Sequence, residues 1–206
     1  MGFYRRYVLP KLIDLACGAK PVSAQRQKVV PLASGLVLEV GIGSGLNLPY
    51  YDPAKVERVT GLDPAEEMLD YARRRAVGLR FPVDYLALVG DSIPLARHSV
   101  DSVLVTYTLC SIPDAVAALE GMRRVLKPKG RLIFCEHGKA PDAAVRRWQG
   151  RLNPLWGRIG GGCNLDRDIP ALIEAAGFRI ESLDSAYLPH TPRFAGFNYW
   201  GSAKAR

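Results

Sequence analysis

Short apolar segments alternate with amphipathic ones along most of the chain. Residues 36–41 are apolar except for Glu39, which is typical of a parallel strand buried on both faces. The same pattern predicts six more strands, at 58–62, 84–89, 102–107, 131–136, 178–187 and 194–203. Helices are expected between them, at 65–76, 114–126 and 168–176. This alternation indicates an α/β protein with a mainly parallel sheet and helices on both faces.

The N-terminal region and residues 138–166 are less regular. Two helices are expected at 3–17 and 22–33, with Pro10 breaking or kinking the first. Residues 138–166 contain a helix with Arg147 and Trp148, followed by a run of glycines. We expect one domain over residues 1–206, because the chain shows no internal repeat or linker. Its expected parts are N-terminal helices at 1–34, a cofactor-binding half at 35–137, and substrate-side helices with the last two strands at 138–206.

The composition is that of a globular protein. Of the 206 residues 48% are hydrophobic, and no apolar run is long enough to span a bilayer. Since the N-terminus lacks a signal-peptide pattern, we expect a cytoplasmic protein. The net charge of +8 comes largely from clusters of arginine and lysine on predicted helices. A solvated helix face explains these clusters without a nucleic-acid partner.

Four cysteines are scattered widely through the chain: Cys17, Cys110, Cys135 and Cys163. No two of them have the spacing of zinc ligands or of a redox motif. In a cytoplasmic protein they are expected to remain thiols and to pack as small apolar side chains. We therefore predict no metal site.

A glycine-rich segment directly follows the first buried strand. Gly41, Gly43 and Gly45 permit a sharp turn and let the backbone approach a ligand without Cβ clashes. The second strand ends at Asp63-Pro64, where a carboxylate can accept hydrogen bonds from both ribose hydroxyls of an adenosine. We expect this loop, as far as Asn47, and the Asp63-Pro64 strand end to bind a cofactor that contains adenosine.

Two features favour S-adenosylmethionine over a dinucleotide. The loop reads G-x-G-x-G with Glu39 two residues before it, whereas a dinucleotide needs a helix N-terminus aimed at its pyrophosphate. After the third strand, Asp91 could accept from the adenine amino group, beside Ser92, while Ile93 packs on the ring. Asp91 alone is more simply explained as a turn or helix cap. Together with the glycines and Asp63, it supports S-adenosylmethionine.

Five segments, in this order, resemble the class I S-adenosylmethionine-dependent methyltransferases. They are Leu38-Glu-Val-Gly-Ile-Gly-Ser-Gly, Gly61-Leu-Asp-Pro, Gly90-Asp-Ser-Ile-Pro, Ser99-Val-Asp-Ser-Val and Arg124-Val-Leu-Lys-Pro-Lys-Gly-Arg-Leu. The resemblance implies a Rossmann-like fold with a seven-stranded, mostly parallel sheet whose last strand is antiparallel. We also expect Thr106, at the end of the fourth strand, to contact the cofactor.

The sequence indicates the methyl acceptor less directly than it indicates the cofactor. An in-line displacement at a sulfonium mainly requires that the two reactants are held in line. Forming a thiolate from an alkyl thiol costs only about 2 kcal/mol at neutral pH, against about 4–5 kcal/mol for deprotonating an ammonium. The segment after the fourth strand lacks the polar-Pro-Pro-aromatic motif typical of adenine and glutamine N-methyltransferases. A thiol acceptor is therefore favoured.

His137 is the strongest catalytic candidate among the three histidines. It ends the fifth strand, and ligands of open α/β sheets gather beyond the carboxyl ends of the strands. It could take the acceptor's proton or orient the acceptor, and a hydrogen-bonded structural histidine is the alternative. His190, in a loop near the C-terminus, is a weaker candidate, and His98 is expected in a surface turn.

Four further segments resemble methyltransferase-like proteins that methylate alkyl thiols. They are Thr108-Leu-Cys-Ser-Ile, Phe134-Cys-Glu-His, the stretch from Trp148 to Trp156, and Gly162-Cys-Asn-Leu-Asp-Arg. The resemblance favours S-methylation of a small-molecule thiol. We expect five residues at the acceptor: Tyr107, Cys110, His137, Asn164 and His190.

Two alternatives to a small thiol acceptor stay open. Proteins of that thiol-methylating group carry an N-terminal membrane-associating segment, whereas this chain has only the helix expected at 3–17. That helix could make peripheral membrane contact, which would suit a lipid- or quinone-directed methyltransferase at a membrane surface. The other alternative is a cofactor-binding protein with little catalysis of its own.

Overall fold

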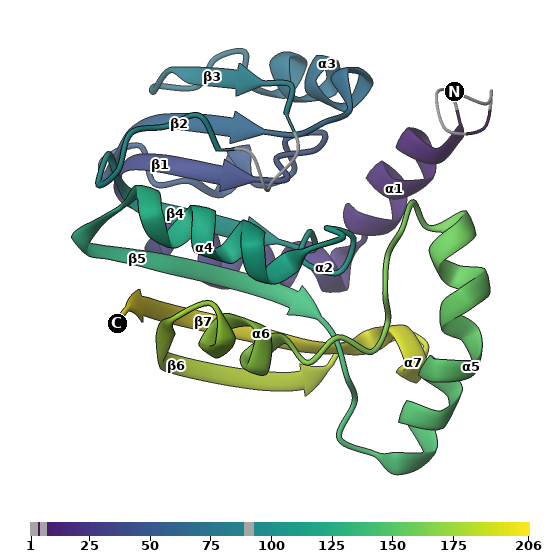
Figure 1. Cartoon of the computed structure of the whole chain (residues 1–206). Helices are drawn as coiled ribbons and strands as arrows, with labels where there is room; N and C mark the ends of the chain where they lie inside the picture. The colour runs from purple at the N-terminus through teal and green to yellow at the C-terminus, as the bar shows by residue number, and fades with distance from the viewer. Residues whose placement is uncertain (1–3, 5–7, 89–92) are drawn as a thin grey trace.

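The computed structural model describes residues 4, 8–88 and 93–206, and a seven-stranded sheet forms the centre of this part (Figure 1). The strands are β1 (Gly35–Val40), β2 (Val56–Leu62), β3 (Val83–Leu86), β4 (Val100–Thr106), β5 (Leu126–His137), β6 (Phe178–Tyr187) and β7 (Phe197–Ala205). Their order across the sheet is β3-β2-β1-β4-β5-β7-β6. β7 runs antiparallel to β5 and β6, and the other pairings in the sheet are parallel. The predicted Rossmann-like α/β fold with an antiparallel last strand is confirmed.

Helices cover both faces of the sheet. They are α1 (Leu9–Cys17), α2 (Lys20–Val29), α3 (Glu66–Arg75), α4 (Ala115–Val125), α5 (Ala143–Ile159), α6 (Ile169–Ala175) and α7 (Arg193–Gly196), with short 3₁₀ helices η2 (Val30–Leu32) and η3 (Leu48–Tyr50). In Figure 1, α4 and α6 lie in front of the sheet and α2 behind it. α1 and α5 extend past the edge to which the arrowheads of β1, β4 and β5 point. None of the described helices is long and apolar enough to cross a membrane.

Two apolar clusters hold these layers together, one on each face. Val103 and Val105 of β4 belong to the cluster that includes Leu119 of α4 and Ile173 of α6. Leu104, between them, belongs to the opposite cluster, with residues of α2, α3 and η2. This alternation follows from the two-residue period of a strand, and it explains why central strands of this sheet are apolar on both faces.

The helix bounds differ from the predicted ones where proline is involved. The described helix α1 begins at Leu9 with Pro10 in its first turn, where the missing N–H breaks no intrahelical bond. Most of the expected helix before Leu9 lies outside the described residues, so a break or kink at Pro10 stays a prediction. α2 ends at Val29 because Pro31 follows in the tighter turn η2. α4 begins as predicted, since the Asp114 side chain caps it by accepting from the Ala117 N–H at 2.9 Å.

Candidate active site

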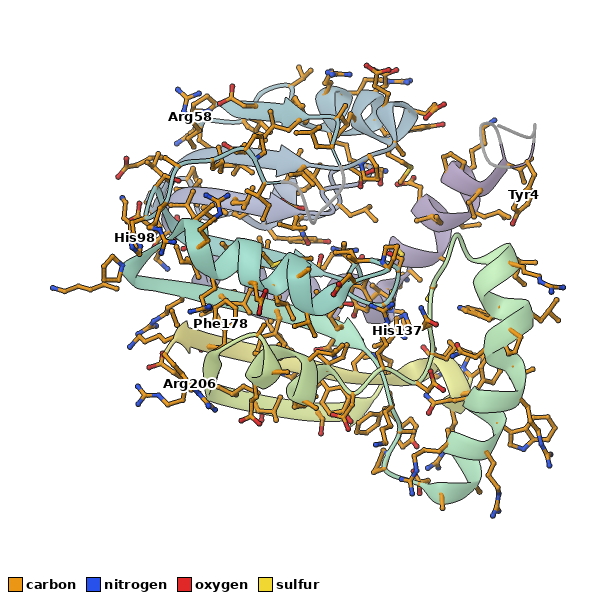
Figure 2. All side chains as sticks on the ribbon, viewed as in Figure 1. Tyr4, Arg58, His98, His137, Phe178 and Arg206 are labelled. Atoms are coloured by element: carbon orange, nitrogen blue, oxygen red, sulfur yellow. The ribbon has the colours of Figure 1, made fainter. Side chains whose placement is uncertain are left out.

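The carboxyl ends of the parallel strands meet at one edge of the sheet. Most of the predicted site residues lie in segments that leave the sheet at this edge, as expected for an open α/β fold. In Figure 2, His137 lies at this edge, whereas His98 lies at the opposite one. His98 occupies an exposed turn, as predicted, with its Nδ1 2.8 Å from the Leu126 carbonyl oxygen.

Of the three loop glycines, only Gly43 opens toward free space. Its φ is +53°, and a Cβ built on it would meet nothing closer than the Met68 methyl carbon at 3.6 Å. A Cβ at Gly41 would instead overlap the Thr108 side chain, and one at Gly45 would lie 2.9 Å from the Ala72 Cα. The sequence predicts close backbone approach to a ligand for the loop as a whole, and Gly43 is the glycine of the three that has open space for it.

Asp63 closes the other side of this open space. Its Oδ2 accepts from the Gly43 N–H at 3.0 Å, and its Oδ1 accepts from the Ala65 N–H at 2.9 Å. Burial raises the pKa of this carboxyl. Each carboxylate oxygen can still accept from a further donor. An open cradle at Gly43 beside a carboxylate fits the ribose of S-adenosylmethionine, with Pro64 next to it in the loop before α3.

A buried hydrogen-bond network holds the glycine-rich loop after β1 in place. Asn47 Nδ2 donates to Glu39 Oε1 at 2.8 Å and to Thr106 Oγ1 at 2.9 Å, and the Tyr51 hydroxyl donates to Glu39 Oε2 at 2.7 Å. Arg26 Nη1 donates to Asn47 Oδ1 and Thr106 Oγ1, both at 2.6 Å. Burial raises the pKa of Glu39 to about 7, although these hydrogen bonds and the Arg26 charge oppose it. Three predicted cofactor residues are thus brought together, and Arg26 was missed.

The N-terminal helix is also tied to the glycine loop. Asp14 of α1 accepts from the Ser44 hydroxyl and forms an ion pair with Arg75 of α3, with N–O distances of 2.8 and 3.0 Å. Arg75 also donates to the Ser44 carbonyl oxygen at 2.6 Å. No sequence motif pointed to these contacts, because they join segments that are far apart in the chain.

Of the three residues predicted to lie at the adenine, the structure describes only Ile93. Asp91 and Ser92 lie outside the described residues. Ile93 is buried in the core cluster on the α4 side, and its carbonyl oxygen accepts from Arg124 at 2.6 Å. A Cβ at Gly121 of α4 would lie 3.4 Å from Ile93 Cδ1. Packing of Ile93 on the adenine ring therefore stays a prediction.

The chain turns sharply after β4, and β5 holds the turn. Tyr107 has a φ of +54°, which is uncommon for a residue other than glycine. The Thr108 and Leu109 N–H groups donate to Glu136 Oε1 at 2.7 and 3.1 Å. Burial raises the pKa of Glu136 to about 7, and its Oε2 has no hydrogen-bond partner among the described residues. Glu136 thus fixes the turn that carries Tyr107 and Cys110.

Cys110, His137 and Cys163 meet beside this turn. Their ligand atoms, two Sγ and one imidazole nitrogen, all lie within 4.8 Å of one another. His137 Nε2 is 3.1 Å from Cys163 Sγ, and the Trp156 indole N–H donates to the same sulfur at 3.4 Å. Cys163 and Trp156 belong to the segments that resemble thiol methyltransferases, but only the fold shows that they contact His137.

The hydrogen bonds in this cluster favour a thiolate at Cys163. The bond from Cys110, together with those from His137 and Trp156, lowers the pKa of Cys163 although burial opposes it. The same bond, with burial, raises the pKa of Cys110. For His137, burial lowers the pKa, but the contact and charge of Cys163 outweigh it, and the pKa is raised.

Asn164 joins the two cysteine-bearing segments. Its backbone N–H and its Nδ2 both donate to the Cys110 carbonyl oxygen, each at 2.9 Å. Gly162, with a φ of +96°, provides the left-handed turn that brings Cys163 and Asn164 back to the sheet edge. His190 lies in an exposed turn, and no hydrogen bond or ring contact of the described residues links it to the cluster. Its predicted role at the acceptor stays a prediction.

Two surface hollows of about 710 and 630 Å³ lie at the opposite edge of the sheet. Their walls include Arg97, His98, Lys127 and Pro128, and none of the predicted site residues lines either of them. The candidate site is therefore defined by the side chains that converge at the carboxyl edge and not by these hollows.

Comparison with known proteins identifies the family of this chain. Residues 38–134 match the family model described as a methyltransferase domain. Thiol S-methyltransferase TMT1B of Rattus norvegicus is 34% identical over 169 residues, which cover 78% of this chain and 68% of the relative. Thiol S-methyltransferase TMT1A of Homo sapiens is 35% identical over 157 residues, covering 74% and 64%. The chain thus spans about two thirds of the length of these relatives.

Solved structures show the same fold at low identity. A SAM-dependent methyltransferase from Thermotoga maritima superposes with a TM-score of 0.71 at 19% identity, covering 98% of both chains. At this level of identity the likeness concerns the fold alone.

Proposed function

The chain belongs to the class I S-adenosylmethionine-dependent methyltransferases, in the group of the thiol S-methyltransferases TMT1A and TMT1B, and from this premise we propose that it methylates the sulfur of a small-molecule thiol. S-adenosylmethionine is the cofactor of this enzyme. The observation that carries the thiol proposal is the alignment with thiol S-methyltransferases over 74–78% of the chain. The activity of the whole relatives is assigned to this chain only as part of that proposal.

In this proposal the site residues divide into two groups. Gly43 and Asp63 hold the adenosine, while the buried network around Glu39 and Asn47 keeps the loop in place. When bound, the cofactor supplies an electrophilic methyl group on a sulfonium, which the acceptor sulfur takes up by in-line displacement. The turn after β4, with Cys110, and His137 at the end of β5 form the acceptor side.

A thiol acceptor suits the chemistry of that side. Ionising a thiol costs only about 2 kcal/mol at neutral pH, so one well-placed side chain is enough to provide that free energy. His137 is the group we propose as the catalytic residue. Its Nε2 is fixed by the contact with Cys163, and its Nδ1 is buried without a partner among the described residues.

The test is a panel of methyl acceptors with purified protein and labelled S-adenosylmethionine. Alkyl thiols, phenols, amines, a demethylated quinone and phospholipid vesicles are compared by formation of S-adenosylhomocysteine and by mass of the methylated product. We expect transfer to thiols. Methylation of an amine, quinone or lipid without methylation of any thiol would contradict the proposal.

A variant pair assigns the role of His137. We expect His137→Gln to lower turnover about 10²–10⁴-fold, with cofactor affinity nearly unchanged, because the residue serves the acceptor. A thiol of low pKa is already ionised when it binds. With such a thiol the variant should therefore regain part of its lost turnover, by up to about 2 kcal/mol of activation free energy. His98→Gln, at the opposite edge, is the matched control. Equal losses with low- and high-pKa thiols would show that His137 does not act on acceptor ionisation.

One observation favours a second candidate, a lipid- or quinone-directed methyltransferase. Apolar side chains are exposed on the two helices that extend past the carboxyl edge: Leu12 and Leu15 on α1, and Trp148, Leu155 and Ile159 on α5. Exposed Arg147 and Arg151 lie on α5 among them. The quinone and vesicle arms of the acceptor panel decide between the two candidates.

A further inference from the structure

The cluster of Cys110, His137 and Cys163 is built like a metal site. The ligands come from three separate segments, namely the turn after β4, the end of β5 and the loop after α5. Two sulfurs and one imidazole nitrogen are the ligand atoms that Zn²⁺ prefers in proteins. Their convergence is unexpected from the sequence, because none of the spacings is that of a known zinc motif.

The separations between the ligand atoms suit a tetrahedral ion. With Zn–S near 2.3 Å and Zn–N near 2.0 Å, a tetrahedron places its ligand atoms about 3.5–3.8 Å apart. Here all three atoms lie within 4.8 Å of one another, and the His137 Nε2 to Cys163 Sγ distance is 3.1 Å. The upper limit of 4.8 Å exceeds the tetrahedral separation by about 1 Å, so ligand-atom shifts of up to about 1 Å would complete the coordination.

Surrounding hydrogen bonds already hold the two cysteine ligands in place. Asn164 clamps the Cys110 carbonyl oxygen from the segment that carries Cys163. Glu136 clamps the turn before Cys110 from the strand that ends in His137. The Trp156 N–H donates to Cys163 Sγ at 3.4 Å, as an outer partner of a metal-bound thiolate would. Such support lowers the cost of ordering a metal site.

Two buried polar atoms beside the cluster are available to bind water or a ligand. His137 Nδ1 and Glu136 Oε2 have no hydrogen-bond partner among the described residues. Buried polar atoms in folded proteins are normally paired with protein, water or a ligand. Both atoms belong to the segment that supplies the imidazole ligand.

We propose that Cys110, His137 and Cys163 bind one zinc ion and leave its fourth position open for the sulfur of the methyl acceptor. Three protein ligands with an open position are typical of reactive zinc sites, whereas structural sites are closed by a fourth ligand. An acceptor thiol that ligates the ion loses its proton to solvent and is held as a thiolate, so His137 would promote acceptor ionisation through the ion and not as a base. The second half of this inference rests on the proposed function, and the first half does not.

The decisive measurement is metal binding by the whole reduced protein. Protein purified without chelators is analysed for zinc by mass spectrometry, stripped, and titrated with Co²⁺. We expect one zinc per chain and a thiolate-to-cobalt charge-transfer absorption that saturates at one equivalent. Addition of an alkyl thiol should then change the visible cobalt spectrum, because the fourth ligand changes.

Variants locate the ligands. Cys110→Ser, Cys163→Ser and His137→Gln should each weaken Co²⁺ binding by more than about 100-fold, and Trp156→Phe, which removes only an outer hydrogen bond, by about 10-fold. Cys17→Ala and Cys135→Ala, outside the cluster, should keep the absorption. Affinity for S-adenosylhomocysteine serves as the check that each variant is folded.

A measurement on the unaltered chain covers variants that fail to fold. Zinc should slow alkylation of Cys110 and Cys163 by N-ethylmaleimide, but not that of Cys17. Reduced protein that takes up neither metal and shows no such protection would overturn the site. Metal binding without methylation of any thiol would refute the proposed function and leave the site standing. Thiol methylation by protein free of metal would refute the acceptor role of the ion.

Discussion

Gly43 combines a left-handed backbone conformation with open space, and these two properties can be separated by experiment. Gly43→Ala should lower the free energy of unfolding by about 1–2 kcal/mol, because φ is +53°. It should also weaken binding of S-adenosylhomocysteine by more than about tenfold, since the new Cβ enters the space beside Asp63.

Gly78→Ala is the matched control for this substitution. Its φ is +86°, and a Cβ there would meet nothing within 4 Å. It should carry a similar stability cost and leave the affinity measured by calorimetry unchanged. If both variants bind the ligand like the unaltered protein, Gly43 does not line the cofactor site.

Glu39 makes stability depend on pH. Its folded pKa of about 7 lies above the ordinary value of 4.5, so the folded state holds the proton more tightly than the unfolded state. Stability from this group is therefore present at low pH and is lost as the pH rises from about 4.5 to about 7, by up to roughly 3 kcal/mol.

Urea unfolding at pH 5 and pH 8 tests this prediction. Glu39→Gln keeps the shape of the side chain but cannot ionise, so the difference in unfolding free energy between the two pH values should shrink. The same change at the exposed Glu57 should leave that difference as it is. An unchanged difference in Glu39→Gln would show that Glu39 titrates alike in the folded and unfolded states.

Helix α2 does more than cover one face of the sheet. It delivers the buried Arg26 to Asn47 and Thr106, and the guanidinium lies 5.1 Å from the centre of the Tyr107 ring. Arg26→Met should lower the free energy of unfolding by about 2–4 kcal/mol, because two charge-assisted hydrogen bonds are lost and Asn47 loses one of its partners. The affinity of this variant for S-adenosylhomocysteine should also be lower than that of the unaltered protein.

Gln27→Met, on the exposed side of the same helix, is the control for this prediction. It should leave stability within about 0.5 kcal/mol of the unaltered protein. Equal stability and affinity in Arg26→Met and Gln27→Met would mean that α2 does not support the cofactor loop.

Cofactor binding should increase the thermal stability of the whole molecule. S-adenosylhomocysteine at 100 times its Kd should add about 2.7 kcal/mol, which raises the Tm by about 5–10 °C for a chain of this size. NAD should raise it little, since the glycine loop enters a 3₁₀ turn, η3, and no long helix starts there to face a pyrophosphate.

The Asp63→Ala variant tests whether this increase in Tm comes from binding at the predicted site. If Kd rises 100-fold, the same ligand concentration adds only about 0.4 kcal/mol. The melting curve without ligand serves as the reference for folding. A shift in Asp63→Ala as large as in the unaltered protein would remove Asp63 from the cofactor site.

The sequence by itself determined the fold and most of the cofactor side. The apolar strands, the glycine loop after β1 and the acid after β2 are local patterns, in which the periodicity of a strand and the geometry of a turn restrict which residues are possible. The order of Glu39, Gly43, Asp63 and Thr106 along the chain was therefore enough to assign them to one edge of a parallel sheet. Fold and cofactor class are confirmed by the topology and by the family to which the chain belongs.

Only the tertiary structure decided what each side chain contacts. Arg26 carries no motif, and it reaches the cofactor loop because α2 packs against β5 and β7. Cys110, His137 and Cys163 have no informative spacing, because they are joined through three segments that meet only when the sheet is formed and the loop after α5 folds back. Contacts between residues far apart in sequence depend on packing of the whole chain, which no local pattern encodes.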